Sequence, residues 1–305
     1  MAKLVVTGAT GFVGRALVPL LLDAGHTVTV LTRDADRARS LGAVTPITAD
    51  LQNLGAWTAA LADTAAVLHL AGESVAARRW DARQKQRLRD SRVETTRTLV
   101  EAIAALPPTS RPRALISASG TDYYPFAPDT AFDDDEVTER DPPGDSFLAR
   151  LCRDWETEAL AAAAHGLRVA CLRTAMVLGP GGALSQLSLP FRFFVGGPIG
   201  TGRQWVPWIH VDDAARVYVL AATDDRYTGP INLVTDSVRN ADLSRAIGRT
   251  LHRPSWLPVP GFALRLAVGE LADYALHGRR VVPARLRALG FTWSHPDLAS
   301  ALAPK

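Results

Sequence analysis

The chain lacks both a disulfide framework and a membrane-length apolar run. It holds only two cysteines, Cys152 and Cys171, in 305 residues, so no disulfide-built scaffold is predicted and a reducing compartment is the simpler expectation. No apolar run approaches the roughly 18 residues that a membrane-spanning helix needs. The apolar stretch at residues 4–6 is also too short for a signal peptide. We therefore predict a cytoplasmic protein with no membrane partner.

Positively charged residues slightly outnumber negatively charged ones. The 34 lysines and arginines against 31 acidic residues give a net charge of +3, and because both signs are interspersed, we predict no nucleic-acid partner. With 47% hydrophobic and 21% charged residues, the composition excludes disorder and collagen-like repeats. We also predict no metal site. The length leaves open one large α/β domain or a domain with a smaller cap.

Short β-branched runs alternate with longer helical patterns. The predicted strands are residues 4–7, 27–31, 66–70, 114–117 and 168–172. The predicted helices are residues 12–24, 84–104 and 147–164. Nearly continuous apolar strands suit a sheet that is covered on both faces, and the alternation with helices predicts a doubly wound parallel α/β sheet.

The residue composition of the sequence changes after Thr174. Residues 1–174 are predicted to form a dinucleotide-binding domain. From residue 175 onward, glycines and prolines surround an aromatic stretch, and two further helical patterns follow. We predict that residues 175–305 mostly form a smaller substrate-covering region, with one strand near 231–234 returning to the sheet. The acidic stretch 133–136 is typical of a solvated loop.

A glycine-rich turn, Thr7-Gly-Ala-Thr-Gly-Phe-Val-Gly14, follows the first predicted strand and opens the first predicted helix. That context favours a dinucleotide-binding turn over a plain glycine turn. Gly8 would permit the tight turn, Gly11 the approach of the pyrophosphate, and Gly14 close packing of helix on strand. The helix N-terminus would supply free N–H groups to the phosphates. The same turn adds three further predicted cofactor contacts, Thr10, Phe12 and Val13.

The cofactor is predicted to be NADP rather than NAD. At the end of the second strand, where a carboxylate usually binds the ribose 2′-hydroxyl, the chain has Arg33. A guanidinium suits a 2′-phosphate, although Asp34 follows at once and an exposed arginine can serve solubility alone. Further predicted cofactor contacts are Asp50 and Leu51, with a surface loop as an equal alternative, and Leu70, Ala71 and Gly72, whose small residues let the backbone pass close to the cofactor.

The chain resembles a known family over nearly its whole length. The motifs that carry the resemblance are the glycine turn, Leu70-Ala-Gly-Glu73, Arg79-Trp80, Ser117-Ala-Ser119, Tyr123-Tyr124, Trp155-Glu156, Leu172-Arg-Thr174, Gly197-Pro-Ile-Gly200, Trp208-Ile-His210 and Asp212-Asp213. They resemble the extended short-chain dehydrogenase/reductase superfamily, which binds nucleotides on a Rossmann sheet. More narrowly, they resemble its atypical "epimerase family" branch, whose members mostly lack assigned reactions. The stretch 252–291 is similar to that branch's C-terminal extension.

The resemblance implies a catalytic Ser, Tyr and Lys, of which the chain keeps only the first. Ser119 matches the serine position. The window that should hold the Tyr/Lys pair offers Phe147 with Leu151, or Leu148 with Cys152. None of these side chains can act as a phenolate or an ammonium group, and a serine hydroxyl alone has too high a pKa to serve as a base near neutral pH.

Other side chains are candidates for the missing proton carrier. Tyr123 and Tyr124 follow the fifth strand, and Tyr124 is the first choice if a cation such as Lys85 or Arg173 lowers its pKa; packing of both rings is the alternative. Glu73 is a second candidate, with an ion pair or helix cap as its structural alternative. His210 is a third, although with Asp212 it also fits a helix cap.

The leading functional prediction is an NADP(H)-binding oxidoreductase or epimerase-like enzyme that acts on a small organic substrate. Two alternatives stay open. The missing Tyr/Lys pair favours a catalytically silent NADP-binding module, and lyase or cyclase chemistry on the same fold is the other. Helices 84–104 and 147–164 are where members of the superfamily commonly pair, so a homodimer is one expected assembly.

Overall fold

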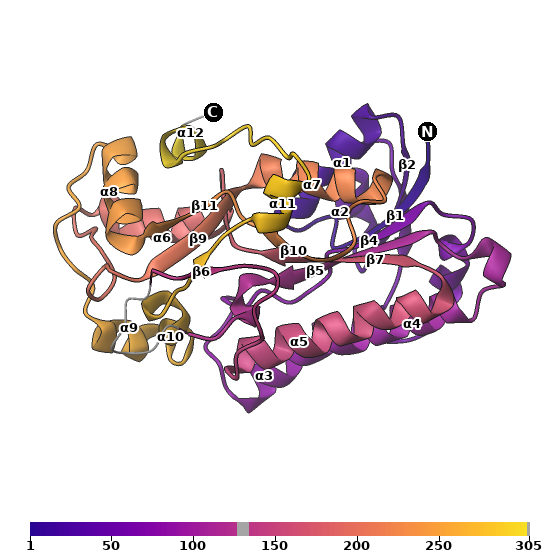
Figure 1. The fold of residues 1–305 in the computed structure, drawn as a ribbon, viewed down its shortest axis with the longest axis horizontal. Helices are drawn as coiled ribbons and strands as arrows, with labels where there is room; N and C mark the ends of the chain where they lie inside the picture. Colours follow the sequence, from indigo (N-terminus) through magenta and orange to yellow (C-terminus); the bar gives the residue numbers. More distant parts are fainter. Residues whose placement is uncertain (127–133, 304–305) are drawn as a thin grey trace.

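A seven-stranded parallel sheet forms the centre of the molecule (Figure 1). The computed structural model describes residues 1–126 and 134–303. The strand order is β10-β7-β5-β4-β1-β2-β3. The strands are β1 (Lys3–Thr7), β2 (Thr27–Thr32), β3 (Thr45–Thr48), β4 (Ala66–His69), β5 (Ala114–Gly120), β7 (Arg168–Thr174) and β10 (Gly229–Leu233). The predicted doubly wound α/β fold is confirmed.

Helices cover both faces of this sheet (Figure 1). One face carries α1 (Phe12–Asp23), α7 (Val211–Thr223) and α11 (Ala284–Ala288), and the other carries α4 (Thr95–Ala104) and α5 (Phe147–Leu160). Successive side chains of a strand point to opposite faces, so in β1 Leu4 and Val6 join the core under α1 while Val5 joins the core under α4. This two-sided burial explains the continuous apolar runs.

The predicted helix 84–104 is interrupted. It consists of α3 (Ala82–Arg89), a π-helical turn over Asp90–Glu94, and α4. The wider turn brings Ser91 and Arg92 to the end of β4, where Ser91 Oγ accepts the Glu73 N–H at 3.0 Å and Arg92 Nη2 donates to the Glu73 carbonyl oxygen at 2.8 Å. Periodicity of apolar residues cannot reveal this extra residue, and such bulges are frequent at functional sites.

The region after β7 contributes both to the central sheet and to a second layer. The strand predicted near 231–234 is β10, which pairs in parallel with β7. The helices α7 and α11 also pack on the sheet. A smaller sheet contains β8 (Met176–Leu178), β9 (Trp205–His210) and β11 (Asp236–Arg239), and β6 (Glu136–Val137) pairs with β12 (Arg280–Val281). The domain division at residue 174 stays a prediction.

In the first part of the chain, the short helix α2 (Ala35–Arg39) connects β2 and β3. Further helices complete the second part of the molecule. They are α6 (Gly182–Arg192), α8 (Asn240–Leu251), α9 (Gly261–Val268), α10 (Leu271–Leu276) and α12 (Leu298–Leu302). Within the described ranges, no helix combines the length and the hydropathy required to cross a bilayer. In the acidic stretch, residues 134–136 are exposed, and residue 133 lies outside the described residues.

The strand order places a crevice between β1 and β4. From β1 the chain proceeds to β2 and β3 on one side, and from β4 it proceeds to β5 and β7 on the other. In open α/β sheets, ligands bind at the carboxyl ends of the strands at such a switch point. The glycine turn after β1 and the small residues after β4 therefore meet at one edge of the sheet.

Candidate functional site

The turn between β1 and α1 requires glycine at two positions. Gly8 has a φ of +68°, and a Cβ there would lie 2.6 Å from the backbone carbon and oxygen of Leu70. A Cβ on Gly14 would lie 2.5 Å from the carbonyl oxygens of Gly8 and Ala9. The helix α1 begins after Gly11 without a side-chain cap. Its first N–H groups therefore remain available to an anion.

A cavity of about 310 Å³ lies along this turn. It brings together nine of the twelve predicted cofactor residues: Gly8, Thr10, Gly11, Arg33, Asp50, Leu51, Leu70, Ala71 and Gly72. The other three, Phe12, Val13 and Gly14, lie in the first turn of α1 and are not among the residues that line the cavity. Glu73, predicted as a proton carrier, also lines this cavity. Their roles in cofactor binding stay predictions.

Arg33 lines the same cavity. Its side chain is exposed, and among residues 1–126 and 134–303 no acidic side chain forms an ion pair with it. The neighbouring Asp34, the main argument for NAD in the sequence, instead caps α2 by accepting the Arg37 N–H at 3.0 Å. Among the described residues that line this cavity, Arg33 is the single arginine or lysine.

Gly11→Val should abolish binding of a dinucleotide and leave the protein folded. A Cβ at position 11 would lie 3.1 Å from the Gly8 carbonyl oxygen, a tight contact, and the branched side chain would occupy the space of the pyrophosphate. Gly14→Ala is the comparison, because its Cβ would strike two backbone carbonyls and should destabilise the fold. Circular dichroism and a binding titration separate the two effects. Loss of the fold in Gly11→Val would show that Gly11 serves packing.

A buried ion pair lies beneath the end of β5. The Arg173 guanidinium donates to both oxygens of Glu156, at 2.8 Å each, and Ser119 Oγ donates to Glu156 Oε1 at 2.7 Å. The side chains of Arg173 and Glu156 are only 3% and 7% exposed. Burial alone would lower the pKa of Arg173, but its hydrogen bonds and attraction to Glu156 raise it. The hydroxyl proton of Ser119, the predicted catalytic serine, is therefore engaged in a hydrogen bond to Glu156.

The same network holds the predicted tyrosine pair. Tyr124 OH accepts from Arg173 at 2.9 Å and donates to Asn232 Oδ1 at 2.7 Å, while the Arg173 guanidinium lies 3.5 Å from the Tyr123 ring centroid. Arg173 is thus the cation beside Tyr124, whereas Lys85 pairs with Glu270. Burial nevertheless raises the pKa of Tyr124 to about 12. The condition under which Tyr124 could carry the proton, a pKa lowered by a cation, is therefore not met, because desolvation outweighs the Arg173 charge.

Asp122 lies where the sequence offered no candidate. A Cβ on Gly120 would lie 3.6 Å from Asp122 Oδ2 and 3.4 Å from Cys152 Sγ, so the carboxyl group and the thiol are neighbours at the end of β5. Although Asp122 opens on a cavity, partial desolvation raises its pKa to about 6, against the attraction of Arg92. Burial raises the pKa of Cys152 to about 12, which excludes a thiolate near neutral pH.

Asp122 and Arg92 lie between two cavities. Asp122 lines a second cavity of about 390 Å³ formed by residues of α6, α8, α10 and the small sheet. The Arg92 guanidinium lies against Gly72, which lines the first cavity. Neither residue is among the side chains predicted above, because the contacts that bring Arg92 to Gly72 and Asp122 to the cavity depend on the tertiary fold.

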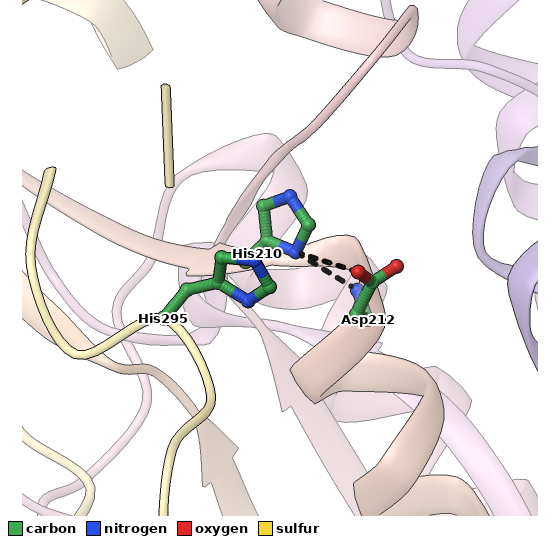
Figure 2. A group of neighbouring side chains, drawn as sticks. All are labelled: His210, Asp212 and His295. Carbon is green, nitrogen blue, oxygen red and sulfur yellow. Dashed lines mark hydrogen bonds and ion pairs between the residues drawn. The ribbon is translucent and has the colours of Figure 1, made fainter. Parts of the chain in front are cut away.

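His210 lies apart from both cavities. It ends β9, and its Nδ1 accepts the Asp212 N–H at 3.2 Å, which caps α7. Figure 2 shows its imidazole stacked on that of His295, with 3.7 Å between ring centroids. Asp212 completes a group whose ligand atoms lie within 4.8 Å of one another. Lone pairs of stacked imidazoles lie in nearly parallel planes and do not converge on one ion, so we assign the group to capping and packing.

A buried carboxylate next to this group fastens the C-terminal segment. Asp213 is fully buried at the start of α7. It accepts the backbone N–H groups of Ser294 and His295, at 2.8 and 2.9 Å, and pairs with Arg216 at 2.8 Å. One side chain of the sheet-packing helix thus holds a segment about 80 residues further along the chain.

Comparison with protein families gives two matches. The profile of the NAD dependent epimerase/dehydratase family matches residues 4–233. A domain of unknown function, DUF1731, matches residues 259–304. The first match spans the central sheet and both walls of the crevice, and the second spans α9 to α12.

Individual relatives are similar over nearly the whole chain. The "Epimerase family protein SDR39U1 homolog, chloroplastic" of Arabidopsis thaliana is 38% identical over 97% of this chain and 84% of its own length. The crystal structure of the human epimerase family protein SDR39U1 with NADPH is 35% identical, has a TM-score of 0.84, and covers 98% of this chain and 97% of its own. MoeE5, in complex with UDP-glucuronic acid and NAD, is 25% identical with a TM-score of 0.76, over 98% and 97%.

Proposed function

The chain belongs to the NAD dependent epimerase/dehydratase family, and on that premise we propose that it is an NADPH-dependent oxidoreductase acting on a carbonyl or alcohol substrate. The observation that carries the proposal is the composition of the first cavity. It joins the glycine turn, the uncapped N-terminus of α1 and the unpaired guanidinium of Arg33. These groups match a pyrophosphate at one end and a 2′-phosphate at the other.

Arg33 should decide the choice between the two cofactors. A charge-assisted contact to phosphate contributes about 1.5–3 kcal/mol, which is about ten- to a hundredfold in affinity. We expect NADPH to bind more tightly than NADH by this factor, and Arg33→Ala to remove the preference. Fluorescence titration of both cofactors measures it. Arg39→Ala is the matched control, because Arg39 pairs with Asp36 and does not line the cavity. Equal dissociation constants in the unmodified protein would contradict the proposal.

The proton carrier that we propose is Asp122 rather than either tyrosine. Tyr124 OH is engaged by Arg173 and Asn232, and Tyr123 packs on the Arg173 guanidinium. Asp122 instead faces the open cavity with a carboxyl group whose pKa is raised to about 6. A general acid works best when its pKa lies near the working pH.

With Asp122 as the proton carrier, the proposed reaction is the reduction of a carbonyl group to an alcohol. NADPH, when bound, supplies the hydride to the carbonyl carbon. Asp122 in its protonated form gives its proton to the carbonyl oxygen as the C=O π bond opens, and the resulting carboxylate regains a proton from water. Arg92 holds the carboxylate electrostatically during this interval. Alcohol oxidation is the reverse, with Asp122 as the base.

Two observations support a reducing compartment such as the cytoplasm and a small-molecule partner. Both cysteines are buried free thiols, and the two cavities are of the size that small ligands occupy. A homodimer stays a prediction. A protein that binds NADPH but reduces no carbonyl would instead be the silent module considered from the sequence.

A further inference from the structure

The wall of the second cavity is mainly apolar. It is formed by side chains from several elements, among them Leu148, Met176, Leu187, Leu243, Leu271 and Val281. These residues come from α5, β8, α6, α8, α10 and β12. Because they line a space of about 390 Å³, a ligand there would remove apolar surface from water on many sides at once, which is the main source of affinity in such pockets.

The polar side chains on this wall are largely used by the protein itself. Asn240 Oδ1 accepts the Ile199 N–H at 2.7 Å, and Tyr274 OH accepts the Leu148 N–H at 2.9 Å. Thr174 Oγ1 donates to the Leu172 carbonyl oxygen at 3.1 Å. Tyr124 OH is held in the buried network described above. These groups therefore stabilise the shape of the cavity, and the atoms that they use within the protein are not available to a ligand.

Positive charge is scarce on the same wall. Among the described lining residues, Arg279 is the single arginine and there is no lysine. His277 contacts the Asp273 carbonyl oxygen through Nδ1 at 3.0 Å, and its ring packs against Phe126. A nucleoside diphosphate carries charge on two phosphates, which proteins bind with several guanidinium, ammonium or N–H groups. The wall therefore suits an uncharged, apolar molecule better than a nucleotide sugar.

We propose that the second cavity binds an apolar ketone or aldehyde, or the corresponding alcohol, with its oxygen toward Asp122 and its hydrocarbon body against Leu187, Leu243 and Leu271. This inference rests on the proposed function only for the identity of the reacting group. The apolar binding site stands on the cavity wall itself.

The test is calorimetric titration of the full-length protein, with saturating NADPH, using 4-phenyl-2-butanone and UDP-glucuronic acid as probes. We expect the ketone to bind at least tenfold more tightly and with a negative heat-capacity change, the mark of apolar burial. Tighter binding of UDP-glucuronic acid, or no binding of the ketone, would overturn the proposal.

Two leucines on α6 give a matched pair of variants. Leu187 is half-buried on the cavity wall, whereas Leu189 is 53% exposed and lies outside it. Leu187→Gln should weaken ketone binding about five- to tenfold, and Leu189→Gln should leave it unchanged. Leu271→Gln repeats the test from α10 if Leu187→Gln fails to fold by circular dichroism. Equal affinities in the wall variants and the control would contradict the assignment.

NADPH oxidation in the same samples separates this inference from the proposed function. Ketone binding without NADPH oxidation would leave the apolar site standing and remove the hydride-transfer proposal. Oxidation of NADPH by small polar aldehydes alone, with no ketone binding, would support hydride transfer and remove the apolar site.

Discussion

Asp122→Asn should lower the rate of carbonyl reduction by about 10²–10⁴-fold, the contribution typical of a positioned general acid. The amide keeps the size of the carboxyl group but cannot release a proton to the forming alkoxide. The dissociation constant of NADPH should be unchanged, because Asp122 lines the second cavity and not the first. Steady-state turnover measured with saturating cofactor checks the first expectation, and a fluorescence titration checks the second.

The pKa of Asp122 also predicts how the rates of reduction and oxidation change with pH. The pKa of Asp122 is raised to about 6, and reduction needs the protonated form. The rate of reduction should therefore fall as the pH rises through about 6, whereas the rate of alcohol oxidation should rise. In Asp122→Asn, both of these pH dependences should be absent.

Other acidic and phenolic side chains serve as comparisons for Asp122. Asp23→Asn, at an exposed position at the end of α1, is the control and should behave as the unmodified protein. Glu73→Gln and Tyr123→Phe test the alternative carriers. A larger loss of turnover in either of these variants than in Asp122→Asn would identify that residue as the proton carrier.

Glu156→Ala should destabilise the protein by about 3–5 kcal/mol, the usual result of removing one partner of a buried ion pair. The variant leaves Arg173 with an uncompensated charge at 3% exposure. It also removes the acceptor of the Ser119 hydroxyl. Chemical denaturation with guanidinium chloride measures the change in the free energy of unfolding.

The same helix supplies the control for Glu156. Glu158 pairs with Arg97 at 2.7 Å, but these side chains are 22% and 42% exposed. Solvent screens such a pair, so Glu158→Ala should cost about 1 kcal/mol or less. Removing Glu156 and Arg173 together should cost less than the sum of the single variants, because no lone charge remains. Equal losses in Glu156→Ala and Glu158→Ala would show that burial of the first pair has no energetic weight.

Local sequence patterns were sufficient to predict the glycine turn and six of the seven strands of the central sheet, but not the short edge strand β3. The run around Leu4 and Val6 is apolar because β1 is buried on both faces, and Gly8 and Gly14 are required by backbone contacts within a few residues or across one strand pair. Such constraints act at short range, so they leave a visible pattern. The order of these strands and the position of the glycine turn follow from them, whereas β5 and β7 extend beyond the predicted ranges 114–117 and 168–172 to Gly120 and Thr174.

The buried network around Glu156 and Arg173 was beyond the same reasoning. Glu156 and Arg173 lie 17 residues apart on different elements, and Tyr124 meets Asn232 across 108 residues. No periodicity reports such partners. Tyr124 was the first choice for a proton carrier because its place on the loop was predictable, whereas the hydrogen bonds of its hydroxyl group depend on the tertiary fold.

The way in which Asp213 holds the C-terminal segment limits how this protein can be rebuilt. A chain cut before Ser294 would lose both N–H donors to a carboxylate that no water reaches, and only Arg216 would remain to balance its charge. Exchanging the last 50 or so residues for those of a relative would succeed only where the incoming loop presents two adjacent N–H groups at that spot. The C-terminal segment is therefore fastened to the helix that packs on the sheet, and it is a poor place for a fusion or a split site.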